Sequence, residues 1–324
     1  MASPQPTITQ LRALVAVADH RHFGRAAAGL HVSQPTLSSA VAALERTLGV
    51  QLVERTTRSV LLTGVGEEVV RRARGVLGAV DDLAEVAVRA REPLVGDIRL
   101  GVIPTVAPYL LPRLLPALRD RWPQARLRLR EAQTATLLAE LRGGALDLAL
   151  LALPNDEPGI TEIPLYDEDF VLVTPAGHPL AGGAAVPTAA LAGQDLLLLE
   201  DGHCFRAQAL DVCREAGARE RSALRAASLS TIVQMVAGGL GLTLLPAGAV
   251  GVEVGEGRGL AVATFRRPAP HRRIGLAHRA TSARVGDWQL LADQFRVALP
   301  GAGLDLIPIP ADGPTSPDPR IIPA

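Results

Sequence analysis

The stretch FGRAAAGLHVSQPTLSSAVAALERTLGVQLVERTTRSVLLTGVG, residues 23–66, contains two helical patterns joined by a brief turn. In the second pattern Ser33 suits the N-cap position, Pro35 falls in the first turn and Gly49 suits the end of the helix. Two short strand-like runs follow within residues 50–63. This order of elements predicts a helix-turn-helix followed by a β-hairpin wing.

The predicted second helix has one apolar and one polar face. Its core-facing positions are Leu37, Val41, Leu44 and Leu48. The opposite face, near the start of the helix, offers short polar groups that can reach base edges and phosphates in a major groove, and arginines on the wing suit phosphate contacts. The predicted DNA-contacting residues are Ser33, Gln34, Pro35, Thr36, Ser38, Arg55 and Arg58.

The charge of this region has the sign that DNA binding requires. Residues 1–66 hold six arginines against Asp19, Glu45 and Glu54, a net charge of +3. The alternative is a small helical bundle whose Ser and Thr side chains only cap and solvate a helix.

Helical patterns flank this segment on both sides. A first helix is predicted over residues 7–20, and a long helix from Thr63 to about Arg91. The apolar residues of the long helix recur at three- and four-residue steps: Val69, Ala73, Val76, Val80, Leu83 and Ala87. Because nothing nearby in the sequence would cover this stripe, we expect the long helix to pair with a second copy of itself.

The composition narrows the class of protein. The chain has 324 residues, which suggests about two domains, and a formal net charge of zero, so no global attraction to nucleic acid or membrane follows. The opening MASPQPTITQ has no signal-peptide pattern, and charges or prolines interrupt every apolar run before it could span a bilayer. We expect a soluble, cytoplasmic protein without a membrane partner. Lasting disulfides are rare in the cytoplasm.

Beyond residue 96, strand and helix patterns alternate, which predicts a parallel α/β sheet. A second series opens with DFVLVTP, residues 169–175. The predicted domains are residues 1–66 (DNA binding), 67–96 (linker helix and hinge) and 97–299 (regulatory). The regulatory part is divided into subdomain I, residues 97–166 and 268–299, and subdomain II, residues 167–267. Residues 300–324 are rich in Pro and Gly and are predicted to be a disordered tail.

Residues 23–66 resemble the winged helix-turn-helix of the LysR-type transcriptional regulators. They depart from the family pattern at Ser39 and Ala40, where larger polar or basic residues are common. The resemblance implies a dimerising linker helix and a regulatory domain of two Rossmann-like subdomains, crossed twice by the chain as in periplasmic binding proteins. It also implies homodimers or homotetramers on double-stranded promoter operators, with RNA polymerase as a further partner.

The only two cysteines, Cys204 and Cys213, lie in EDGHCFRAQALDVCREAG, residues 200–217. From about Phe205 this segment is predicted to be a helix, with Cys213 on its apolar face and Cys204 at its amino end. The other residues of that face are Phe205, Ala209, Val212 and Ala216. A helix separates Cα atoms nine positions apart by about 13 Å, whereas a disulfide needs less than about 7 Å. Forming the bond must therefore unwind or expel the segment, as in a redox switch.

The surroundings of Cys204 predict a reactive thiol. A helix amino end, with His203 and Arg206 nearby, favours the thiolate. A thiolate that attacks peroxide becomes a sulfenic acid, which a second thiol condenses to a disulfide. Cys204 is therefore the predicted sensing thiol and Cys213 the resolving thiol. The alternative is a buried structural cysteine beside an exposed bystander.

The cysteine segment also resembles the hydrogen-peroxide-sensing branch of the LysR family. So do GVIPTVAPYLLPRLLPAL, LREAQTATLLAEL and GLGLTLLP, and the likeness extends to about Val297. It implies that Thr105 and Thr134 line a peroxide pocket, and that His203 and Arg206 orient peroxide and activate the thiolate. It further implies a reversible Cys204–Cys213 disulfide that controls oxidative-stress defence genes and is reset by a glutaredoxin- or thioredoxin-type reductant. Neither a cofactor nor a metal is expected.

Three other functions fit the sequence less well. A LysR-type regulator with a small-molecule inducer between its subdomains would not need the cysteine pair. A thiol peroxidase or reductase would not need the helix-turn-helix, and the Cys-x-x-Cys spacing of thioredoxin-type enzymes is absent. A solute-binding protein would need a signal peptide. The sequence therefore favours a transcription factor and not an enzyme.

Overall fold

The computed structural model describes residues 5–55, 60–89, 93–182, 185–255, 257, 259–298 and 306–309. The chain forms two compact units that divide close to residue 92, with residues 142–145 assigned to the first. The described helices include none that is long and apolar enough to cross a membrane.

The first unit is a winged helix-turn-helix. It contains α1 (Ile8–His20), α2 (Phe23–Gly29), α3 (Gln34–Leu48), the antiparallel pair β1 (Val53–Arg55) and β2 (Val60–Leu62), and α4 (Gly64–Arg89). Local signals set these bounds: Ser33 caps α3 by accepting a hydrogen bond from the amide of Thr36, and Gly49 ends α3 with a φ of 69°. Of the four residues predicted to face the core, Leu37, Val41 and Leu44 are buried, and Leu48 is half-buried and packs against the same core.

The second unit is built on a sheet whose order is β10-β6-β11-β5-β3-β4, with β9 and β12 also paired to β6. The strands, in chain order, are β3 (Gly96–Val102), β4 (Ala125–Glu131), β5 (Leu148–Leu153), β6 (Ile160–Pro175), β9 (Thr243–Pro246), β10 (Leu260–Thr264), β11 (His271–Arg279) and β12 (Leu306–Pro308). A separate parallel pair joins β7 (Asp195–Leu199) to β8 (Arg219–Ala226). The helices are α5 (Ala107–Arg121), α6 (Thr134–Arg142), α7 (Cys204–Ala216), α8 (Leu229–Ala237), α9 (Val250–Glu253) and α10 (Val285–Ala298).

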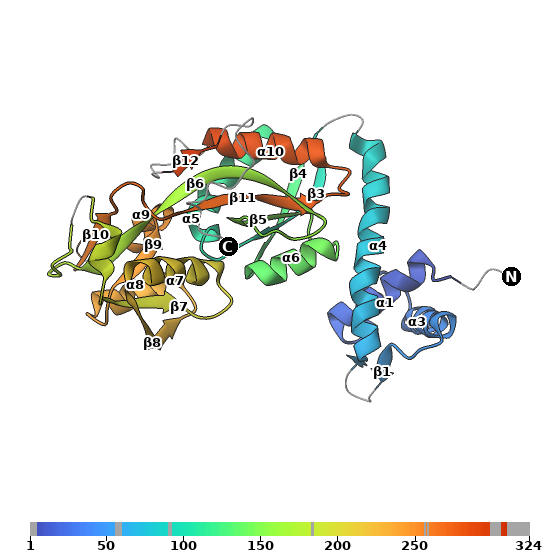
Figure 1. Ribbon diagram of the computed structural model, residues 1–324. Helices are drawn as coiled ribbons and strands as arrows, with labels where there is room; N and C mark the ends of the chain where they lie inside the picture. The colour runs from blue at the N-terminus through green and yellow to red at the C-terminus, as the bar shows by residue number, and fades with distance from the viewer. Residues whose placement is uncertain are drawn as a thin grey trace. The chain divides into compact units, whose positions relative to one another are not determined.

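The expectation of a parallel sheet is wrong for the strands that join the subdomains. β3 pairs in parallel with β4 and β5, but β11 runs antiparallel to both β5 and β6. The reason is the path of the chain: it passes from subdomain I to subdomain II along β6 and returns along β11, so these two strands must point in opposite directions. Figure 1 shows the two long strands side by side.

The expectation of a disordered tail is wrong for residues 306–309. The backbone of β12 pairs antiparallel with Tyr166, Asp167 and Glu168 of β6, and the amide of Ile309 donates to the carbonyl of Leu165 at 2.9 Å. Ile309 is buried. The physical reason is that β6 offers an edge with open backbone groups, and the short apolar run LIPI, residues 306–309, can complete it.

Each subdomain has its own hydrophobic core, and the two cysteines contact different ones. The core of subdomain I is formed by side chains of β3, β5, α5, α6 and α10, and half-buried Cys204 packs against it. The core of subdomain II is formed by side chains of β7, β9, α7 and α8, and includes Cys213, which is 3% exposed. Helix α7 therefore joins the two cores.

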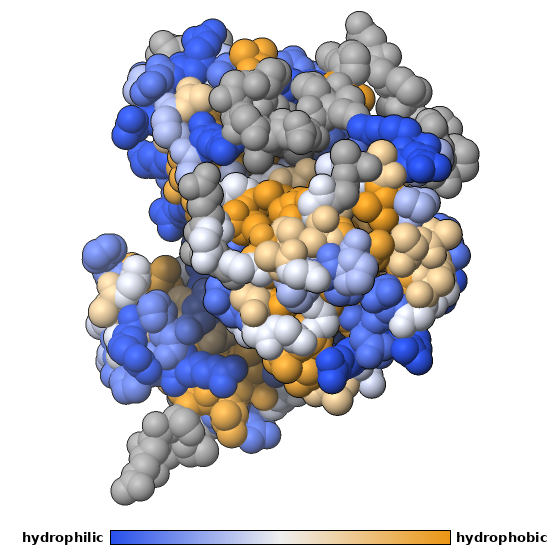
Figure 2. All heavy atoms as spheres, turned by 90° about the vertical axis from the view of Figure 1, so that its left-hand side faces the viewer, coloured by the Kyte–Doolittle hydropathy of each residue, from blue (hydrophilic) through white to orange (hydrophobic). Residues whose placement is uncertain are grey.

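The surface of the molecule is not uniformly hydrophilic. Figure 2 shows hydrophobic side chains gathered among hydrophilic ones on one face. Large apolar side chains exposed in the second unit include Leu129, Val252, Leu290 and Val297.

Candidate redox site and nucleic-acid interface

The start of α3 presents the polar face that the sequence predicts. Ser33, Gln34, Pro35 and Thr36 are exposed, and Ser38 is half-buried. The Ser33 and Thr36 hydroxyls lie 2.7 Å apart, so they form one polar pair at the tip of the helix. Gln34 is the longest side chain of this exposed group and therefore the one with the greatest reach toward a base edge.

A carboxylate fixes the wing to α3. Glu45 Oε1 accepts hydrogen bonds from the amides of Leu52 at 2.8 Å and Val53 at 3.1 Å, so β1 starts at a set position beside the helix. Arg55 ends β1. The predicted phosphate contact Arg58 lies outside the described residues, and so does the side chain of Arg55.

The redox segment is helical, and α7 begins at Cys204 itself. His203 occupies the N-cap position without a side-chain capping bond, and Gly217 ends the helix with a φ of 69°. The apolar face is buried as predicted, apart from its last residue, which is half-buried: Phe205, Ala209, Val212, Cys213 and Ala216. Both cysteines are free thiols. Because the helix is intact, their Cα atoms are separated by about 13 Å.

Burial gives Cys213 the character of an inert thiol. Its removal from water raises the pKa of the Cys213 thiol to about 11, and the nearby negative charge of Glu220 acts in the same direction. Cys213 therefore stays protonated at neutral pH while α7 is folded. A resolving role would require the helix to open first.

The loop before Cys204 is held against subdomain I through Gly202. This residue has a φ of +97°, and a methyl group added to it would collide with the side-chain amide of Gln133. Gln133 Nε2 in turn reaches the carbonyl of Asp201 at 3.5 Å. Because Gln133 directly precedes Thr134, the first residue of α6, this contact brings the start of α6 near the loop that carries Asp201 and Gly202.

Thr134 carries an unsatisfied hydroxyl. It is the first residue of α6, and its Oγ1 atom is buried with no hydrogen-bond partner among the described residues. A buried hydroxyl without a partner is costly, so this site favours a small polar molecule as an additional occupant.

Thr105 is tied to an arginine that sequence reasoning missed. Arg272 of β11 donates through Nη1 to Thr105 Oγ1 at 2.9 Å and through Nη2 to the Thr105 carbonyl at 3.0 Å. Its Nε donates to Glu168 at 2.8 Å, and its guanidinium lies 5.4 Å from the centre of the Phe205 ring. The signal available in the sequence was the pair Arg272 and Arg273, which directly precedes the apolar run IGLA of the predicted strand.

His203 and Arg206, which the sequence predicts to favour the Cys204 thiolate, have different surroundings. Burial lowers the pKa of His203, so the imidazole is mostly neutral at neutral pH. Arg206 keeps its charge, but its guanidinium binds Glu220 and Asp201, with nitrogen–oxygen distances of 2.8 and 2.9 Å. The favourable electrostatic feature that remains at Cys204 is the amino end of α7.

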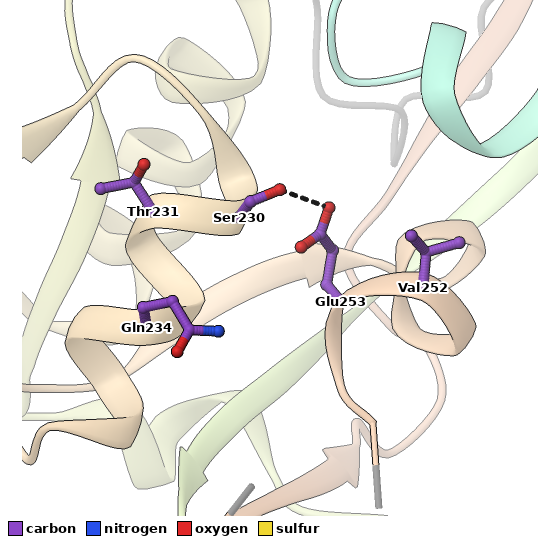
Figure 3. A pocket seen from close by; sticks show the side chains of 5 residues that line it. All are labelled: Ser230, Thr231, Gln234, Val252 and Glu253. Atoms are coloured by element: carbon purple, nitrogen blue, oxygen red, sulfur yellow. Dashed lines mark hydrogen bonds between the residues drawn. The ribbon is translucent and has the colours of Figure 1, made fainter.

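A shallow pocket of about 400 Å³ lies elsewhere in subdomain II. It is lined by Ser230, Thr231, Gln234, Val252 and Glu253. Figure 3 shows the Ser230 hydroxyl pointing at the Glu253 carboxylate, to which it donates at 2.8 Å; the Tyr109 hydroxyl donates to the same oxygen at 2.8 Å. The lining residues belong to subdomain II, and Tyr109 of subdomain I bonds one of them, Glu253.

Two protein families match the chain. The bacterial regulatory helix-turn-helix family of lysR type matches residues 8–67, and the LysR substrate binding domain matches residues 91–299. The chain therefore belongs to the LysR family, whose members are transcription regulators and not enzymes.

Within that family the chain is a homologue of the OxyR proteins. It is 54% identical to a "Probable hydrogen peroxide-inducible genes activator" of Streptomyces viridosporus, over 91% of this chain and 95% of the relative. It is 47% identical to the "DNA-binding transcriptional dual regulator OxyR" of Escherichia coli K12, over 91% of this chain and 96% of that protein.

Solved structures of OxyR share the fold. A full-length OxyR of Pseudomonas aeruginosa with a Cys-to-Asp substitution matches with a TM-score of 0.77 and 39% identity, covering 90% of this chain and 98% of that one. A Corynebacterium glutamicum OxyR with a Cys-to-Ser substitution, bound to hydrogen peroxide, matches with a TM-score of 0.65 and 42% identity, covering 93% and 95% of the two chains. These likenesses confirm the predicted fold class: a winged helix-turn-helix followed by a two-subdomain α/β regulatory domain.

Proposed function

We propose that this protein is a DNA-binding transcription factor that senses hydrogen peroxide through a reversible Cys204–Cys213 disulfide. The observation that carries the proposal is the placement of the chain's only two cysteines at opposite parts of one helix. Cys204 packs against subdomain I and Cys213 lies in the core of subdomain II. Joining them must rebuild the contact between the subdomains, which is how a covalent signal becomes a change of shape.

The chemistry takes two steps. The Cys204 thiolate attacks one oxygen of hydrogen peroxide, the O–O bond breaks, and hydroxide leaves as the sulfur becomes a sulfenic acid. The Cys213 thiolate then attacks that sulfur, the S–S bond forms and a second hydroxide leaves, so the two sulfurs together supply the two electrons that reduce peroxide to water. A dithiol reductant of the glutaredoxin or thioredoxin class returns the pair to thiols.

The pocket residues have separate tasks in this proposal. The Thr134 hydroxyl, buried and unsatisfied, hydrogen bonds the peroxide. The Thr105 hydroxyl accepts from Arg272 and so turns its own hydrogen toward the ligand. Neutral His203 orients the peroxide next to Cys204, and Arg206 holds the first turn of α7 in place. The amino end of α7 favours the thiolate.

On DNA, the proposed contacts to bases come from Gln34 and Ser38, supported by Ser33, Pro35 and Thr36, and the contacts to phosphates from Arg55 and Arg58. We infer a homodimer formed through α4, where Leu83 is 73% exposed, and a homotetramer formed through exposed apolar surface of the regulatory domain. We further infer that the protein acts in the cytoplasm, with operator DNA and RNA polymerase as its partners.

Mass spectrometry of the full-length protein tests the core of the proposal. After one equivalent of peroxide, the peptides that contain Cys204 and Cys213 should be found joined and lighter by two hydrogens. The Cys204→Ser variant should lose rapid peroxide consumption, while Cys213→Ser should accumulate a trappable sulfenic acid at Cys204. Faster alkylation of Cys213 than of Cys204 in the reduced protein would reverse the assignment and contradict this interpretation.

A further inference from the structure

Arg206 of α7 and Glu220 of β8 form a two-pronged ion pair. Arg206 Nη1 donates to Glu220 Oε1 at 2.8 Å and Nη2 donates to Oε2 at 3.2 Å. The side chains of Arg206 and Glu220 are 8% and 19% exposed, so solvent weakens the pair little. Planar bidentate pairs of this kind fix geometry as well as supplying energy.

The pair belongs to a small network beneath α7. Arg206 also donates from Nε to Asp201 at 2.9 Å and from Nη1 to the Leu199 carbonyl at 3.3 Å. Arg225 of β8 donates to Glu220 at 3.2 Å and to Asp201 at 2.9 Å. Because Asp201 is 76% exposed, its share is screened by water, and Glu220 is the dominant partner of Arg206.

Glu220 also acts on the second cysteine. Arg206 and Cys213 are seven positions apart on α7, so they lie two turns apart on the same face. The charge of Glu220 is close enough to contribute to the raised pKa of the Cys213 thiol, and the hydrogen bond from Arg206 lowers the pKa of Glu220 itself. One carboxylate therefore faces both the cation and the thiol of that helix face.

Disulfide closure cannot leave this arrangement intact. Arg206 lies between the two cysteines in sequence, and the chain between them must leave the helix to bring their Cα atoms from about 13 Å to less than about 7 Å. Arg206 would then have to withdraw from Glu220. The network thus opposes closure, and Glu220 supplies most of that opposition.

We propose that Glu220 is a positioning residue that, through Arg206, holds α7 in its reduced helical form and so sets both the rate of disulfide closure and the redox equilibrium of the cysteine pair. This inference rests on the proposed peroxide-sensing function. The first chemical step, attack of the Cys204 thiolate on peroxide, does not require α7 to open, so it depends on Glu220 only through the position of the first turn of α7. The second step, attack of the Cys213 thiolate on the sulfenic sulfur with loss of hydroxide, does require α7 to open.

The test compares Glu220→Gln with Asp211→Asn in the full-length protein. The Glu220→Gln substitution keeps the shape of the side chain but removes its charge, whereas Asp211→Asn removes a surface pair of the same helix, the one between Asp211 and Arg214 at 2.6 Å. The rate of disulfide closure is monitored by quenching samples with an alkylating reagent and analysing them by mass spectrometry. The redox equilibrium of the cysteine pair is measured in dithiothreitol buffers. We expect the disulfide to close about tenfold faster in Glu220→Gln, and the midpoint reduction potential of the cysteine pair to be about 30 mV more negative. Both quantities should stay close to wild type in Asp211→Asn and in Glu220→Asp, which retains the charge.

The rate of the first step is measured separately, by trapping the sulfenic acid with a dione reagent in a Cys213→Ser background. We expect Glu220→Gln to leave this rate within about twofold, because no opening of α7 is involved. A changed sulfenic acid rate with unchanged closure and midpoint would overturn the proposal.

A second readout does not depend on redox chemistry. In a Cys204→Ser background, where no intramolecular disulfide can form, Glu220→Gln should increase hydrogen exchange of the α7 amides and leave α8 unchanged. Equal α7 exchange in Glu220→Gln and Asp211→Asn would overturn the role of Glu220. If instead the wild-type protein formed no disulfide with peroxide, the proposed function would fail while the exchange experiment still decided the role of Glu220.

Discussion

Arg272 of β11 and Thr105, 167 positions apart in sequence, are joined by two hydrogen bonds of 2.9 and 3.0 Å at a fully buried site. The same guanidinium binds Glu168 of β6 and lies near the ring of Phe205, the residue after Cys204. One buried cation thus links both crossing strands, a predicted pocket residue and the start of the redox helix.

We predict that Arg272→Met destabilises the reduced protein by about 3–5 kcal/mol, because it leaves the Glu168 carboxylate buried without its cation. Urea unfolding measures the loss. The double variant Arg272→Met/Glu168→Gln should recover part of it, since a neutral amide at position 168 can still accept from the Gly248 amide. Equal stability of the single and double variants would show that the unpaired charge is not the cause.

Gly202→Ala should slow the reaction with peroxide by about tenfold, because the added methyl group displaces the Gln133 amide from the loop before Cys204. Gly159→Ala is the matched control: its φ is +79°, but a methyl group there would have nothing within 4 Å. Both variants should lose about 1–2 kcal/mol of stability from the left-handed backbone. Only Gly202→Ala should change the rate at which peroxide oxidises the Cys204 thiol. A similar slowing in Gly159→Ala would point to general destabilisation.

The raised pKa of Cys213 predicts a loss of stability at high pH. In the folded protein the thiol keeps its proton up to a pKa of about 11, against an ordinary value of 9.0, so the unfolded state binds fewer protons between these values. The stabilising contribution is complete below pH 9 and is lost as pH rises toward 11, by roughly 2–3 kcal/mol in total. Thermal unfolding of the reduced protein from about pH 8 to about pH 11 should show this slope, and Cys213→Ala should flatten it. An unchanged slope in that variant would mean that other groups cause it.

Gln34→Ala should relax sequence preference at one position in each half-site and cost about 1–3 kcal/mol there, because Gln34 is the exposed side chain best placed to reach a base. Arg58→Ala should weaken all sequences alike and lower the salt slope of binding by about one. Binding titrations on variant operators at several salt concentrations separate these effects. Arg119→Ala, an exposed arginine of α5, is the control and should change neither quantity.

Local sequence was sufficient for the helix-turn-helix and for the redox helix. The caps at Ser33 and Gly49, the spacing of Leu37, Val41 and Leu44, and the apolar face of α7 all depend on neighbours within a few positions. The separation of the two cysteines then follows from helix geometry alone. For this reason the amino-acid sequence by itself determines the DNA-binding module and the need for α7 to open.

Contacts between distant segments decided the rest. Strand β8 (RERSALRA) is mostly exposed and has no apolar alternation, so it gave no pattern to recognise, yet it carries Glu220 and Arg225. The antiparallel direction of β11, the Arg272–Thr105 bonds and the pairing of β12 with β6 join residues more than 100 positions apart. The charge state of His203 depends on burial, and the direction of the Arg206 side chain depends on a carboxylate of another strand. Periodicity reports only which side of an element is buried; which charges meet there depends on how the chain folds back, and only the tertiary structure determines that.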